Sequence, residues 1–180
     1  MPSLGPPTVR VRESFLAAMR EFQAEGRGVP SDNTSIGAQL RERWPQWNTG
    51  CGFAEYVDEL LAQPREGTPR PEGWVPWTTL WYVEGEEYLG GLAIRHRLTP
   101  HLLEYGGHVG YDVRRSARRR GHATAMLRQV LPVARGLGLE RILLTCDVGN
   151  IASRRVIEVN GGVLEDQCGV KLRYWIPTPG

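Results

Sequence analysis

The second half of the chain alternates strand and helix patterns, and this alternation constrains the fold more than any other feature. β-Branched and aromatic stretches, which are typical of strands, recur from Thr78 to Ile176 with two amphipathic helical patterns among them. In chain order we predict strands at 78–83, 88–96 and 108–113, a helix at 121–135, a strand at 141–147, a helix at 150–160, and strands at 163–167 and 170–176. This order predicts a mixed α/β sheet with helices packed on it. Ligands of such sheets bind beyond the carboxyl ends of strands that helical crossovers connect, here at 113–124 and 147–153.

Composition places the chain among ordinary globular proteins. Of its 180 residues, 41% are hydrophobic and 23% are charged, and no stretch approaches the ~20 apolar residues that would span a bilayer. Residues 1–7 lack the basic and apolar regions of a secretory signal, and we expect them to form a disordered lead-in. The three cysteines show no CxxC spacing, so we expect no metal site and a reducing, cytoplasmic setting.

The first half of the chain is less regular. Apolar residues at helical spacing predict helices over 13–25 and 53–63, with a shorter helix near 36–43. Loops rich in glycine and proline lie between the predicted elements, and this half contains Trp44, Trp47, Trp74 and Trp77. These side chains either line a pocket or fill the core, and the sequence does not distinguish the two.

A basic loop joins the strand that ends at Val113 to the helix after it. Five arginines lie within seven residues: Arg114, Arg115, Arg118, Arg119 and Arg120. Gly121 and Ala123 follow at the start of the helix, where free N–H groups attract an anion and small side chains let a phosphate approach the backbone. The loop is either a diphosphate site or a solvated strand-to-helix turn. Nucleic-acid binding is a third interpretation, which the net charge of only +2 disfavours.

The same loop resembles the signature of the GNAT acetyltransferase superfamily. Residues 118–123, Arg-Arg-Arg-Gly-His-Ala, are similar to its Arg/Gln-x-x-Gly-x-Gly/Ala pattern, and residues 150–162 are similar to its Asn-x-x-Ala/Ser helix that ends in glycine. The resemblance covers residues 78–175, and Gly73-Trp74-Val75-Pro76 also resembles a branch of uncharacterised predicted acetyltransferases. It implies a GNAT fold, in which a mixed, mostly antiparallel central sheet of about 6–7 strands is flanked by about four helices. It also implies one domain over residues 8–180, with a divergent helical and loop half on the acceptor side at 8–77 and the sheet with the cofactor site at 78–177.

In this family the cofactor is acetyl-CoA. The resemblance implies that backbone amides of the basic loop hold its pyrophosphate, that the strand edge at 111–113 pairs with its pantetheine amides, and that Asn150 binds a pantetheine carbonyl. The implied cofactor-binding residues are Tyr111, Asp112, Val113, Arg118, Arg119, Arg120, Gly121, His122, Ala123, Thr124, Asn150 and Ser153. Independently of the family, Asn150 and Ser153 suit a helix start because both can cap free N–H groups.

The implied activity is direct transfer of an acetyl group from acetyl-CoA to a primary amine of a small molecule or a peptide. One position departs from the family pattern: many members carry a tyrosine that protonates the leaving thiolate, and Ile157 stands in its place. A thiolate is already a fair leaving group near neutral pH, so transfer does not depend on that acid. The departure also fits a catalytically impaired protein that binds or senses acyl-CoA.

The amine must lose a proton before it attacks, and histidine titrates nearest to neutrality. Alternation along the strand at 108–113 places His108, Gly110 and Asp112 on one face, so we expect His108 to be the base, with His96 as the second candidate. The alternative for each histidine is a structural role, in which hydrogen bonds hold its ring and it takes no part in catalysis. We expect the first two helices and the four tryptophans to form the acceptor site. We expect no nucleic-acid or membrane partner, and only analogy with the family favours a homodimer.

Overall fold

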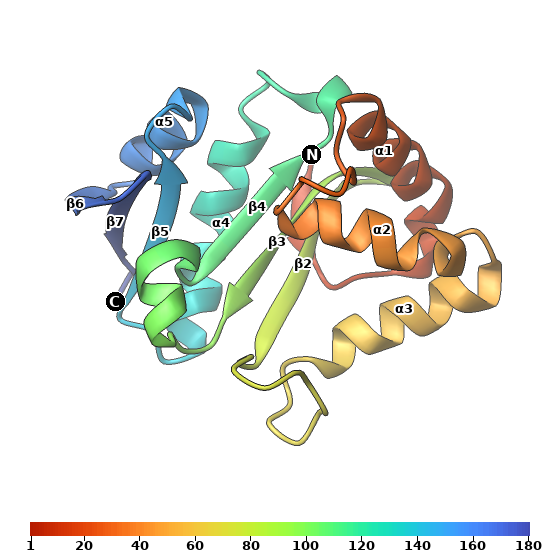
Figure 1. The fold of residues 1–180 in the computed structure, drawn as a ribbon, viewed down its shortest axis with the longest axis horizontal. Coiled ribbons are helices and arrows are strands. Elements are labelled where there is room, and N and C mark those ends of the chain that lie inside the picture. The colour runs from red at the N-terminus through yellow and green to blue at the C-terminus, as the bar shows by residue number, and fades with distance from the viewer.

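The computed structural model describes residues 1–180, and its strands form two sheets with helices on their faces (Figure 1). The first sheet has the order β1-β2-β3-β4 and the second β5-β7-β6, and every pairing is antiparallel. The strands are β1 (Ser3–Gly5), β2 (Trp77–Glu84), β3 (Glu87–Arg95), β4 (Val109–Val113), β5 (Arg141–Asp147), β6 (Val163–Cys168) and β7 (Lys171–Pro177). The α-helices are α1 (Arg12–Ala24), α2 (Ser35–Trp47), α3 (Gly50–Ala62), α4 (His122–Gly136) and α5 (Ile151–Val159). The predicted α/β fold with mostly antiparallel strands is confirmed.

Helices α1, α2 and α3 lie together on one side of the first sheet, where aromatic side chains hold them (Figure 1). The ring of Phe15 on α1 lies 5.0 Å from that of Trp47 and 5.1 Å from that of Trp81 on β2. Trp47 is fully buried, which explains why α2 is longer than the predicted 36–43. The helix continues past Pro45, because packing of Trp47 in the core outweighs the local cost of the proline.

A second apolar cluster lies between the two sheets and helices α4 and α5. It contains Met126 and Leu127 of α4, Ile142 of β5 and Ile157 of α5, each with no exposed surface. Cys146 of β5 belongs to the same cluster, where a free cysteine packs as a small apolar side chain. Helix α4 therefore covers the face of the first sheet that α1–α3 leave free, and it connects that sheet to the second one.

Strands β4 and β5 meet only near their starts and then diverge. The N–H of His108 donates to the carbonyl of Leu143 at 2.7 Å, and the N–H of Leu143 donates to Nδ1 of His108 at 2.9 Å. Beyond this point no ladder joins the two strands, and Figure 1 shows them separating as they run upward. The result is an opening between the carboxyl ends of β4 and β5, beside the starts of α4 and α5.

Two segments differ from the sequence-based expectation. Residues 1–7 are not a disordered lead-in: Ser3–Gly5 pairs with β2 as an edge strand, and the N–H of Leu4 donates to the side chain of Gln129 on α4 at 2.8 Å. A three-residue strand is too short for alternation to reveal it, and its partners lie far away in the sequence. The segment between β3 and β4, where the sequence analysis predicts no regular element, contains a single π-helical turn, Leu102–Gly106. None of the helices is long and apolar enough to cross a bilayer.

Candidate active site

A cavity of about 680 Å³ lies in the opening between β4 and α5. Eleven of the twelve residues predicted to bind a cofactor line it: Tyr111, Asp112, Val113, Arg118, Arg119, Gly121, His122, Ala123, Thr124, Asn150 and Ser153. Arg120 does not line the cavity. Arg27, which follows α1, does line it, and no signal in the sequence relates that residue to a strand more than eighty positions away. The fold thus brings together three segments that the sequence analysis could only consider separately.

The backbone of the basic loop turns twice through the left-handed region before α4 begins. Arg119 has φ +63° and Gly121 has φ +81°, and Gly121 is the N-cap of α4 without any side-chain cap. No protein acceptor meets the N–H groups of His122, Ala123 and Thr124, since the first helical bond runs from Ala125 to the Gly121 carbonyl. Free N–H groups in such a turn form a concave site for an anion, and the positive end of the helix dipole strengthens it.

Two of the five clustered arginines are engaged by α1 and serve to position the loop. Arg118 donates to Glu25 at 2.5 and 2.7 Å and, through Nε, to the carbonyl of Val113 at 2.9 Å. Arg114 is buried and donates to Glu21. These bonds tie the loop to the end of β4 and to the first helix. Arg118 also lines the cavity, so these bonds position the loop and its contact with the cofactor stays a prediction.

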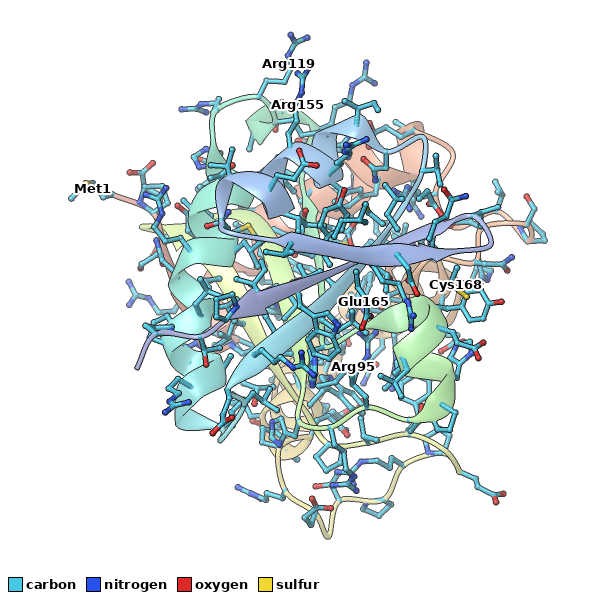
Figure 2. All side chains as sticks on the ribbon, turned by 90° about the vertical axis from the view of Figure 1, so that its left-hand side faces the viewer. Met1, Arg95, Arg119, Arg155, Glu165 and Cys168 are labelled. Atoms are coloured by element: carbon cyan, nitrogen blue, oxygen red, sulfur yellow. The ribbon has the colours of Figure 1, made fainter.

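The remaining arginines of the loop are free of ion pairs. Arg119 and Arg120 are exposed, and no carboxylate lies within salt-bridge distance of either. Figure 2 shows Arg119 projecting into solvent at the same end of the molecule as Arg155 of α5. This end thus presents cationic side chains around the mouth of a cavity with free backbone N–H groups. The combination is suited to a phosphate-bearing ligand.

The start of α5 forms the opposite wall of the cavity. Oδ1 of Asn150 accepts a hydrogen bond from the N–H of Ser153 at 3.0 Å, so Asn150 caps α5 as the sequence predicts. The hydroxyl of Ser153 lies 2.9 Å from that of Tyr111 on β4. Burial raises the pKa of Tyr111 to about 12, although its bond to Ser153 opposes that shift. Side chains from β4 and α5 thus meet across the opening in the sheet.

A second cavity of about 1270 Å³ lies between α2, α3, the loop that precedes β2 and the face of the first sheet. Trp74 and Trp77 line it, and their rings lie 5.6 Å apart. The other two candidate tryptophans do not line it: Trp47 is fully buried and Trp44 packs against the same core. The sequence did not distinguish a pocket from the core for the four tryptophans. In the structure Trp74 and Trp77 line a cavity, whereas Trp44 and Trp47 belong to the core.

Neither candidate histidine lies in a cavity. His108 is 5% exposed, its ring is 6.2 Å from that of Trp175, and its Nδ1 is occupied by the Leu143 N–H. Burial, with a smaller effect of the Arg95 charge, lowers the pKa of His108 to about 4. Nε2 of His96 lies 2.9 Å from Oγ1 of Thr78, and burial lowers its pKa as well. Both histidines are hydrogen-bonded structural residues, so the expectation that either is the base does not fit this geometry.

Strand alternation misplaced His108 because that residue precedes β4, at the point where the chain turns toward β5. The alternation is right for Gly110 and Asp112, which both line the second cavity. Ile157 has no exposed surface and belongs to the core between the sheets, α4 and α5, so this side chain supplies no acid. No group of three or more histidine, cysteine, aspartate or glutamate side chains is arranged to hold a metal ion.

The two antiparallel sheets, which open between β4 and β5 beside the starts of α4 and α5, form the fold of the GNAT acetyltransferases. The protein-family model described as acetyltransferase (GNAT) domain matches residues 41–163 of the sequence. The chain therefore belongs to the GNAT acetyltransferase family. No curated protein matches the chain. The fold and the family together make it an acyltransferase.

Solved structures of the same fold match nearly the whole chain. The structure of RimJ from Mycobacterium smegmatis in complex with CoA-disulfide is 20% identical with a TM-score of 0.66, and the match covers 98% of this chain and 81% of that one. The PaiA N-acetyltransferase from Thermoplasma acidophilum in complex with coenzyme A is 10% identical with a TM-score of 0.62, over 98% and 99% of the two chains. Ribosomal-protein-S5-alanine acetyltransferase from Vibrio fischeri is 11% identical with a TM-score of 0.66, over 98% and 93%.

Proposed function

We propose that this protein transfers an acetyl group from acetyl-CoA to a primary amine of a small molecule or a peptide, by direct attack of the amine on the thioester. The observation that carries the proposal is the meeting of two cavities at the end of β4. One cavity has the anion-binding loop, and the other has space for an acceptor beside Trp74 and Trp77. Two substrates bound in the two cavities can therefore meet without a covalent enzyme intermediate.

The residues of the first cavity fit the coenzyme in charge and in hydrogen bonding. The free N–H groups at 122–124 suit a diphosphate, and the exposed Arg119 adds long-range attraction. The edge of β4 that faces the opening has no partner strand, so its amides are available to a ligand with peptide-like amides. RimJ and PaiA, which share this fold, were solved with CoA-disulfide and coenzyme A respectively.

A peptide acceptor is supported by the size of the second cavity and by the name of one relative, a ribosomal-protein-S5-alanine acetyltransferase. Cys146 is buried and burial raises the pKa of its thiol, which disfavours a transfer through that cysteine. The three unpaired cysteines are consistent with a reducing, cytoplasmic setting.

A second function is favoured by one observation. Ile157 is buried at the position where the resemblance to the family implies an acid, which is consistent with a protein that binds acyl-CoA without turning it over. Acid catalysis of thiolate departure is dispensable near neutral pH, because the leaving thiol is itself acidic enough. We therefore rank catalysis first and binding alone second.

The test is an assay of thiol release from acetyl-CoA in the presence of a panel of primary amines and short peptides with free N-termini. We expect release that depends on the amine and saturates with it, and an N-acetylated product in equal amount. Saturable binding of CoA with no amine-dependent release over the whole panel would support the binding function and contradict the proposed one.

A further inference from the structure

One carboxylate lies where the two cavities meet. Five residues line both cavities: Arg27, Tyr111, Asp112, Asn150 and Ser153. Asp112 is the one carboxylate among them; it is half-buried, and no hydrogen bond or salt bridge within the chain holds its side chain. A carboxylate that is withdrawn from water without a partner lowers stability, and such groups concentrate at functional sites.

The side chain of Asp112 projects toward the second cavity. Its neighbour Val113 belongs to the core on the α4 side of the sheet, so alternation directs Asp112 and Gly110 to the other face. On β3, Gly91 lies opposite Asp112 and Ala93 lies opposite Gly110. All four residues line the second cavity. At Gly91 the Tyr88 hydroxyl and the Trp81 ring lie 2.9 and 3.3 Å from where a Cβ would stand, whereas at Gly110 nothing lies within 4 Å. The open space beside Asp112 is therefore on the Gly110 side, where a substrate can approach the carboxylate.

The charged groups around Asp112 come from three segments packed against β4. Burial raises the pKa of Asp112, while Arg27 after α1 and Arg118 of the basic loop oppose this shift and Asp32 before α2 adds to it. Burial raises the pKa of Tyr88 on β3, and the charge of Asp112 adds to this increase. A carboxylate in these surroundings binds a proton more readily than one in water, which makes it a stronger base.

We infer that Asp112 is the general base that deprotonates the acceptor amine, an assignment that rests on the proposed function. The amine arrives as an ammonium ion and gives one proton to the Asp112 carboxylate. Its nitrogen then forms a bond to the thioester carbon, and the carbon–sulfur bond breaks with its electron pair on sulfur. The second proton passes from nitrogen to the thiolate, which leaves as CoA thiol, and Asp112 returns its proton to solvent.

The experiment compares Asp112→Asn with wild type and with the control Asp58→Asn, which makes the same chemical change on the exposed face of α3. We expect Asp112→Asn to lower kcat/KM for the amine by about 10²–10⁴-fold, with CoA affinity and melting temperature preserved. Asp112→Glu should recover part of the loss, because it restores a carboxylate. Asp58→Asn should behave as wild type.

A pH profile separates catalysis from a structural role. Because the base acts in its charged form, wild-type kcat/KM should fall as pH drops through the raised pKa of Asp112, and Asp112→Asn should lack this acidic limb. Wild-type activity that Asp112→Asn retains in full, or an acidic limb that persists in the variant, would overturn the assignment and leave the proposed function intact. A wild-type protein that acetylates no amine would overturn both.

Discussion

Nδ1 of His108 accepts a hydrogen bond of 2.9 Å from the backbone N–H of Leu143, at the point where β4 and β5 separate. A strand that leaves its neighbour exposes N–H groups, and a buried N–H without an acceptor costs about 1–3 kcal/mol. In a continuous sheet a backbone carbonyl of β4 would accept the Leu143 N–H; here the His108 imidazole accepts it instead. His108 thus stabilises the opening of the sheet, and the cavity above it depends on that opening.

Replacing His108 should therefore affect stability and not the chemical step. We expect His108→Ala to lower the free energy of unfolding by about 1–3 kcal/mol, because the Leu143 N–H loses its acceptor and a buried ring is removed. Activity per folded molecule should stay within a few-fold of wild type. Thermal unfolding and kinetics on the same preparation decide the matter, and a large loss of kcat at unchanged melting temperature would restore His108 as the base.

The same histidine should make stability depend on pH. The pKa of His108 is lowered to about 4 in the folded chain, while an unfolded histidine titrates near 6.5. Between these values the unfolded state binds more protons, so stability is full above pH 6.5 and falls as the pH drops toward 4. His108→Gln, which cannot titrate, should show a shallower decline in this window. Equal slopes for variant and wild type would contradict the buried, neutral histidine.

Two glycines with the same backbone conformation separate strain from binding. Gly121 and Gly138 have φ +81° and +83°, and an added Cβ would meet nothing within 4 Å at either one. Glutamate at each position should therefore cost a similar 1–3 kcal/mol or so of backbone strain. Only Gly121→Glu also places an anion at the proposed diphosphate site, so calorimetric titration should find CoA binding lost there and retained in Gly138→Glu. Equal CoA affinities for the two variants would show that the basic loop does not bind the cofactor.

Asn150 should contribute to both stability and binding. Its side chain caps α5, and the resemblance to the family places it on a pantetheine carbonyl. We expect Asn150→Ala to weaken CoA binding by about 1 kcal/mol, the usual size of one hydrogen bond, and to lower stability by a similar amount. Thr49→Ala is the matched control, because Thr49 caps α3 outside both cavities. If both variants lose stability and neither loses affinity, Asn150 is a cap alone.

Gly110 should control access of the acceptor. Its Cβ would project into open space in the second cavity, so Gly110→Val should fold and fill part of the cavity floor. We expect kcat/KM for the amine to fall roughly tenfold or more, since steric crowding typically costs about 1–3 kcal/mol, while CoA affinity is kept. Gly5→Val on β1, also facing open space and lining neither cavity, controls for the added β-branch. Unchanged amine kinetics in Gly110→Val would place the acceptor elsewhere.

The elements that the sequence predicted are those with a periodic apolar pattern. Helices α1, α3, α4 and α5 and strands β2 to β7 lie within a few residues of their predicted ranges, because each buries one regular face. What local pattern could not predict depends on distant partners. Strand β1 forms because it pairs with β2, and α2 extends to Trp47 because that side chain packs in the core with α1. The sheet divides at His108, where the ring accepts a hydrogen bond from the Leu143 N–H.

The candidate site shows the same limit. The loop of Gly121 and the cap at Asn150 are local motifs with local physical causes, so the residues alone indicate them. The ion pair of Arg118 depends on Glu25, which lies 93 positions away, and the position of Asp112 between the two cavities depends on segments far apart in the sequence. Histidine titrates nearest to neutrality, but the fold buries His108 and leaves the Asp112 carboxylate without a hydrogen-bond partner beside both cavities.

A single-turnover reaction tests the central claim most directly. The protein, in excess over acetyl-CoA labelled in its acetyl group, is mixed with a primary amine or peptide from the panel, and the products are separated by mass. The account predicts that the label moves onto the amine nitrogen, with one CoA thiol released per labelled amide, and that Gly121→Glu shows no transfer while Gly138→Glu retains it. Label that stays on acetyl-CoA, or that appears only as free acetate with every amine, would contradict it.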